Sequence, residues 1–181
     1  MMPTVFAHAL VGGALAAFLP ASQRSRRLIV GLAAVAMLPD ADVVGFWLGV
    51  PYDHPLGHRG FSHSLCFALL VGCIAPLLLH RGEAVRMRVL LGCGYAAATA
   101  SHGALDAFTN GGLGVGFWIP FSDERLFAPF RPIMTSSIDP AHAFGARGMR
   151  VLANEALWIG LPVASALGLV NLGRVISARV R

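Results

Sequence analysis

Histidine and aspartate residues recur in an otherwise apolar chain, at spacings that could hold a metal ion. In SHGALDAF, His102 and Asp106 stand four residues apart, so a helix would place both side chains on one face. In LPDAD, Pro39 interrupts the helical hydrogen-bond ladder, which would let the carboxylates of Asp40 and Asp42 turn inward. Imidazole and carboxylate ligands without thiolate suit zinc, with manganese or iron as alternatives. We therefore predict a divalent metal site that includes at least one of Asp40 and Asp42.

The stretch HRGFSHSL places two histidines and an arginine at the start of an apolar segment. His63 is predicted to be a metal ligand, whereas His58 is either a second ligand or a loop histidine. Arg59 is predicted to hold an anionic substrate, because a guanidinium fork matches phosphate oxygens. His8, in the first apolar segment, is either a further ligand or a group that hydrogen-bonds between packed helices.

The chain that must position these residues is unusually apolar. It has 181 residues, of which 56% are hydrophobic and 13% are charged, whereas about 25% charged residues is usual for a soluble domain. A single lipid-embedded domain over residues 1–181 is therefore expected. The net charge of +5 comes from short arginine clusters between apolar runs, which is typical of membrane topology, and no nucleic-acid binding is predicted.

Five apolar segments are candidates for crossing a bilayer of about 30 Å hydrocarbon thickness. They are Thr4–Leu19, Leu28–Leu48, Ser64–His80, Met87–Phe108 and Val151–Ile176. The predicted fold is all-α, a polytopic membrane bundle of about five transmembrane helices with a long outer loop.

Arginine clusters set the expected orientation of this bundle. The clusters are Arg24, Arg26 and Arg27; Arg81, Arg86 and Arg88; and Arg174, Arg179 and Arg181. An odd number of spans places all three on one face, which the positive-inside rule makes cytoplasmic. The N-terminus and loops 49–61 and 110–150 would then lie outside, and the C-terminus inside.

Ionisable side chains occur in every candidate span, where their burial in lipid is costly and points to function. Counted at 1.5 Å per helical residue, they lie roughly 20 to 28 Å from the nearest inner-face arginine, within one slab under about 10 Å thick. They are His8, Asp40, Asp42, His63, His102, Asp106 and Glu155. Glu155 is either catalytic or paired with Arg147 or Arg150. Solvent or headgroup contacts are expected for His54, His80 and His142.

These residues favour a metal-dependent hydrolase that acts on a phosphoester, with membrane lipid as the natural substrate. A metal lowers the pKa of water and polarises a phosphoryl group, and Asp42 or Asp106 could take the proton. The predicted catalytic residues are Asp42, Arg59 and Glu155, and the predicted metal ligands are His8, Asp40, Asp42, His58, His63, His102 and Asp106. Two alternatives remain: a metal or proton transporter that uses the same residues, and a non-catalytic membrane protein stabilised by metal.

The chain also resembles a known family over nearly its whole length. HAL, LPDAD, HRGFSHSL, SHGALDAFTNGG and WIPFSDERLFAPFRPI are similar to motifs of the YdjM-like bacterial inner-membrane proteins. That family is described as predicted metal-dependent hydrolases associated with the LexA regulon, so the resemblance implies a multi-pass protein of the bacterial inner membrane. Ser62 stands where the family often has threonine, which keeps the hydroxyl. A more distant likeness, in residue order alone, to zinc-dependent phospholipase C and P1-type nucleases implies a ligand set with Glu155 as a possible late member. The other members would be His8, one of Asp40 and Asp42, His63, His102 and Asp106.

Overall fold

Helices form all the regular structure of the chain in the computed structural model, which describes residues 2–136 and 145–179. Within those residues no β-strand is present. The helices are α1 (Val5–Ala14), α2 (Arg26–Met37), α3 (Val44–Trp47), α4 (Leu65–Leu79), α5 (Val85–Ala107), α6 (Ala146–Glu155) and α7 (Leu161–Arg179). The predicted all-α class is confirmed. The predicted contact of His142 falls outside the described residues.

Polar side chains and a proline fix where several helices begin or break. The side chains of Thr4, Ser25 and Ser64 each accept a hydrogen bond from a backbone N–H in the first turn of α1, α2 and α4, as N-capping residues do. After α2, the chain tightens into a 3₁₀ turn over Leu38–Val43, with Pro39 at its start, before the short helix α3. The backbone therefore changes at LPDAD, as its proline predicted.

Two helical stretches are long and apolar enough to cross a membrane: Arg26–Trp47, and Ala146–Arg179, in which a π-helical turn joins α6 to α7. Two shorter apolar stretches are Val5–Phe18, whose α1 packs against α2, and Leu65–Leu79, which packs against α5. In α7 no residue is buried. Val163 packs partly buried against Ala7, Ile133 and Ile159, whereas Leu169, Leu172 and Ile176 are exposed. A bundle with five spans stays a prediction.

The packed core lies between α1, α2, α4 and α5, with α4 against α5 and α1 against α2. Glycines allow both contacts to be close. A Cβ on Gly12 would lie 2.4 Å from that of Ala36, and one on Gly72 would lie 2.7 Å from the Gly92 carbonyl oxygen. Small residues at crossings of this kind are typical of helices packed within membranes.

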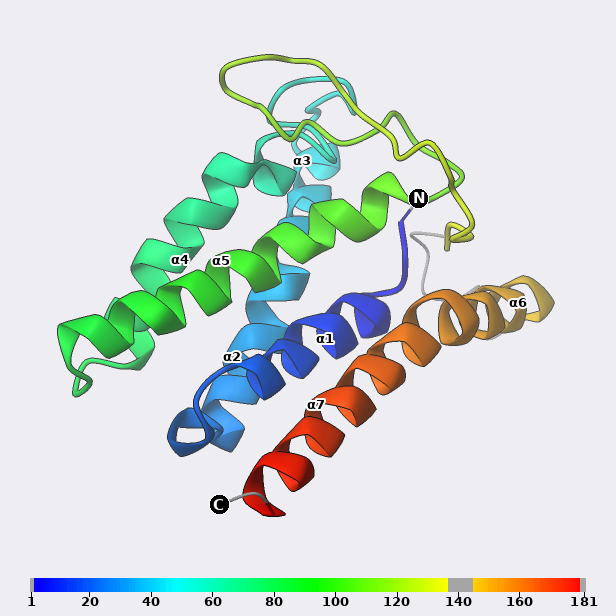
Figure 1. Ribbon diagram of the computed structural model, residues 1–181. Helices are drawn as coiled ribbons and strands as arrows, with labels where there is room; N and C mark the ends of the chain where they lie inside the picture. The colour runs from blue at the N-terminus through cyan, green and yellow to red at the C-terminus, as the bar shows by residue number, and fades with distance from the viewer. Residues whose placement is uncertain (1, 137–144, 180–181) are drawn as a thin grey trace.

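The two ends of the bundle differ in character (Figure 1). Loops 48–64 and 108–136 lie together at the end where α1 begins, whereas the short turns before α2 and between α4 and α5 lie at the opposite end, with the C-terminal end of α7. Two of the predicted arginine clusters therefore stand on the turns far from the long loops. Their position relative to a membrane stays a prediction.

Candidate metal centre

Four separate segments bring the predicted ligands together under the long loops. α1 carries His8, the 3₁₀ turn 38–43 carries Asp40 and Asp42, loop 48–64 carries His58 and His63, and α5 carries His102 and Asp106. Each of these residues except Asp42 is buried. The predicted convergence of distant segments is therefore observed, while metal binding itself stays a prediction.

Four donor atoms form the centre of this cluster. The Nε2 atom of His102 lies 3.1 Å from Nε2 of His63 and 3.2 Å from Oδ1 of Asp40. His63 Nε2 in turn lies 3.4 Å from Oδ2 of Asp106 and 3.8 Å from Oδ1 of Asp40. Tetrahedral zinc with bonds of about 2.0–2.1 Å separates its ligand atoms by about 3.3 Å. These four separations, 3.1–3.8 Å, lie near that spacing.

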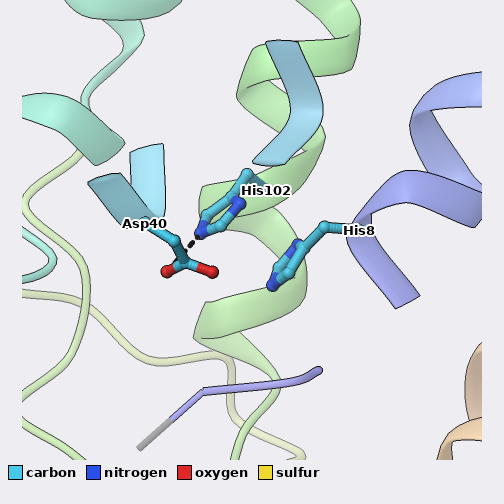
Figure 2. A group of neighbouring side chains, drawn as sticks. All are labelled: His8, Asp40 and His102. Carbon is cyan, nitrogen blue, oxygen red and sulfur yellow. Dashed lines mark ion pairs between the residues drawn. The ribbon is translucent and has the colours of Figure 1, made fainter. Parts of the chain in front are cut away.

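His8 extends the cluster towards α1 (Figure 2). Its ring stacks on the ring of His102, with centroids 3.7 Å apart and an interplanar angle of 13°. Its Nε2 atom lies 3.8 Å from Oδ1 of Asp106. Figure 2 shows the side chains of His8, Asp40 and His102 meeting from three different segments of the chain.

Asp42 lies behind two of the histidines and orients them. Its Oδ1 accepts a hydrogen bond from His58 Nδ1 at 2.7 Å, and its Oδ2 lies 3.2 Å from His63 Nδ1. Oδ2 also accepts from the Ser62 hydroxyl at 2.6 Å and from the Arg59 backbone N–H at 3.3 Å. A carboxylate that accepts from Nδ1–H leaves the Nε2 lone pair for a metal. The two aspartates of LPDAD therefore differ in position: Asp40 faces the centre, whereas Asp42 orients His58 and His63.

Several buried polar atoms of the cluster have no hydrogen-bond partner in the described part of the chain. They are both ring nitrogens of His8, both carboxylate oxygens of Asp40 and Nε2 of His58. An unsatisfied buried polar group costs about 1–3 kcal/mol, so this arrangement is stabilised if a ligand occupies it. The residues that could share an ion form three overlapping groups: His8, Asp40 and His102; Asp40, His58 and His63; and His63, His102 and Asp106.

Arg59 does not take the position that its predicted role requires. Its side chain is fully buried, and its Nε lies 2.9 Å from Oδ2 of Asp106. The two terminal nitrogens donate to the Gly111 carbonyl oxygen at 2.8 Å and to the Thr109 hydroxyl at 2.9 Å. Its backbone is left-handed, with φ of 62°, a strained conformation often found at functional sites. These contacts make Arg59 a positioning residue for Asp106 rather than an exposed anion-binding group.

Glu155 also differs from its expectation. Its two carboxylate oxygens accept hydrogen bonds from the Thr4 backbone N–H at 2.5 Å and the Thr4 hydroxyl at 2.6 Å. Glu155 forms no ion pair with Arg147 or Arg150, all three being described residues, and it belongs to none of the three groups above. It joins the end of α6 to the start of α1, one turn before His8.

Two of the remaining predicted contacts can also be placed. His54 is exposed in loop 48–64. His80 ends α4, where its Nε2 lies 2.9 Å from the Tyr95 hydroxyl. The prediction for His80 therefore missed a partner inside the bundle.

Contacts of Arg125 and Tyr52 that were not predicted hold loop 48–64 in place. Arg125 donates to the backbone carbonyl oxygens of His58, Tyr52 and His54. The ring of Tyr52 meets that of His58 edge-on, with centroids 5.2 Å apart. Burial raises the pKa of the Tyr52 hydroxyl and lowers the pKa of Arg125. The signal in the sequence was only an arginine in a long loop, which did not indicate a partner.

Replacing Asp42 with asparagine should weaken metal binding by about 10–100-fold, as the loss of an orienting carboxylate does. The amide keeps the shape but cannot accept from both Nδ1 atoms with a full negative charge. Isothermal titration with zinc or manganese in detergent would measure the change. Asp53→Asn, at an exposed position in loop 48–64, is the matched control. Unchanged affinity in the Asp42 variant would contradict the orienting role.

A buried histidine–aspartate cluster among helices, two stretches of which are long and apolar enough to cross a membrane, defines an all-α class of protein. The profile of the YdjM inner membrane protein family matches residues 2–178, and the chain belongs to this family. The chain is 36% identical over 172 residues to the inner membrane protein YbcI of Escherichia coli (strain K12). These residues make up 93% of this chain and 97% of the relative. No solved structure matches the chain. The predicted family and inner-membrane association are confirmed; the hydrolase activity and the phospholipase C or P1 nuclease likeness are not.

Proposed function

We propose that the protein is a metal-dependent hydrolase of the inner membrane that cleaves a phosphoester. The observation that carries the proposal is the set of four buried donor atoms on Asp40, His63, His102 and Asp106, of which four pairs lie 3.1–3.8 Å apart. Zinc fits this donor set best, and manganese or iron are the alternatives. A divalent cation supplies Lewis acidity to such a site, since it activates water and polarises a phosphoryl group.

The residues of the chain divide the remaining tasks. Hydrolysis joins a water oxygen to phosphorus and breaks the bond to the ester oxygen, so one group must accept the proton of the water. Any oxygen of Asp40 or Asp106 that does not hold a cation could accept this proton and return it to the ester oxygen that leaves. The oxygens of Asp42 are occupied by four donors, so this residue orients His58 and His63 instead of acting as the base.

The association of the family with the membrane supports a lipid as the substrate. The family is an inner-membrane one, and the exposed surface carries many large apolar side chains, among them Leu69, Leu70 and Ile74 of α4. A phosphoester in a lipid headgroup would be held beside the site by the same apolar surface that holds the protein. The substrate class is therefore a phospholipid or a related membrane phosphoester.

The membrane arrangement is part of the proposal. Five crossings would place the N-terminus outside and the C-terminus in the cytoplasm. The separation of the arginine-bearing turns from the long loops supports it (Figure 1), because positive charge favours the cytoplasmic side.

Metal analysis combined with turnover tests the function. The detergent-purified protein should contain a divalent metal and hydrolyse phospholipid vesicles or bis(p-nitrophenyl) phosphate. A chelator should abolish the activity, and added zinc or manganese should restore it. Bound metal without turnover would contradict the hydrolase and leave a structural role. Metal or proton flux across proteoliposomes without hydrolysis would indicate a transporter.

A further inference from the structure

We infer that the cluster holds two divalent cations, bridged by Asp40 and Asp106. The inference rests on the proposed metal centre and specifies how many ions it holds. Two histidine pairs flank the two carboxylates. On one side the rings of His8 and His102 stack at 3.7 Å; on the other, His58 and His63 are both held through Nδ1 by the same carboxylate.

The two carboxylates are placed between these histidine pairs. Asp40 belongs both to the group with His8 and His102 and to the group with His58 and His63. Asp106 directs one oxygen to each side: its Oδ1 lies 3.8 Å from His8 Nε2, and its Oδ2 lies 3.4 Å from His63 Nε2. Carboxylates that face two ligand sets in this way bridge cations about 3.5–4 Å apart in two-metal hydrolytic sites.

A single cation would leave part of the cluster unsatisfied. A tetrahedral ion uses the four central donors, after which His8 and Nε2 of His58 remain buried without hydrogen-bond partners among the described residues. A second ion gives both histidines a ligand role. His8 and His102 would hold one ion, and His58 and His63 would hold the other.

Charge identifies the kind of substrate that a two-ion site would bind. Asp40, Asp42 and Asp106 with Arg59 give the cluster a formal charge of −2 when its histidines are neutral. One divalent cation neutralises the site, whereas two make it positive. A positive centre attracts a phosphate ester electrostatically, which is the task that the buried Arg59 cannot perform.

Metal stoichiometry and manganese spectroscopy test this inference. The protein is stripped with chelator, loaded with Mn²⁺, desalted and analysed for manganese per chain and for the electron paramagnetic resonance signal of an exchange-coupled pair. We expect two ions and a coupled signal. His8→Ala and His58→Ala should each retain one ion and lose the coupling, whereas the exposed-loop control His54→Ala should retain both.

The outcomes separate this inference from the proposed function. One uncoupled ion in the unmodified protein would overturn the two-ion arrangement and leave the metal centre standing. No bound ion would overturn the metal centre itself. The coupled signal of the unmodified protein needs no variant, so the test holds even if a substitution prevents folding.

Discussion

Substituting alanine for His102 is expected to weaken metal binding at least about 100-fold and to abolish turnover. Its Nδ1 donates to the Ala36 carbonyl oxygen at 2.7 Å, which fixes the tautomer and aims the Nε2 lone pair at His63 and Asp40. Even orienting partners outside the ligand set are worth 10–100-fold, so a central ligand should cost more. Titration calorimetry and the phosphodiesterase assay would measure both effects.

Two controls make this result interpretable. His54→Ala removes an exposed histidine of the same chain and should leave affinity and turnover unchanged. Circular dichroism and thermal unfolding should show that the His102 variant keeps its helices. A folded His102→Ala protein with normal metal affinity would refute the centre described here.

Replacing Arg59 with methionine should lower the free energy of unfolding by about 3–5 kcal/mol. The substitution leaves the buried carboxylate of Asp106 without its guanidinium, and breaking one partner of a buried ion pair costs that much. It also removes the donors to Gly111 and Thr109. Unfolding in detergent, measured on chelated protein, would report the loss without compensation by a bound cation.

Arg125→Met is the matched control for this prediction. Arg125 lies in the same region and donates to three backbone carbonyl oxygens, but none of these is an acid. Its loss should lower the free energy of unfolding by about 1–3 kcal/mol. Equal stability of the Arg59 variant and the unmodified protein would mean that the buried pair is dispensable.

The ligand types and their convergence could be predicted because they depend on local spacing. His102 and Asp106 share a helix face at i and i+4, and Pro39 marks the break at which Asp40 faces the centre. The different roles of Asp40 and Asp42 could not be predicted. Positions two apart point to different sides on any helical turn, and which of the two faces the centre depends on loop 48–64, which brings His58 and Ser62 to Asp42.

The buried position of the Arg59 side chain could not be predicted, because it depends on contacts between segments far apart in the chain. Its partners Thr109 and Gly111 lie 50 and 52 residues away, in the stretch after α5. Nothing in HRGFSHSL indicates that this stretch returns over the arginine. A guanidinium next to histidines indicated an anion-binding site on chemical grounds. Only the fold of the loop shows that the nitrogens of Arg59 bond to groups within the protein.

The order of the donors along the chain has a consequence for assembly. The first, His8, and the last, Asp106, enclose every residue of the three groups that could hold an ion, so the whole set has been synthesised before α6 begins. An ion bound at that stage would fasten the opening helix to its partners while the final third is still being made. The closing helices would then dock on a preformed unit, and the Thr4–Glu155 hydrogen bonds would form last.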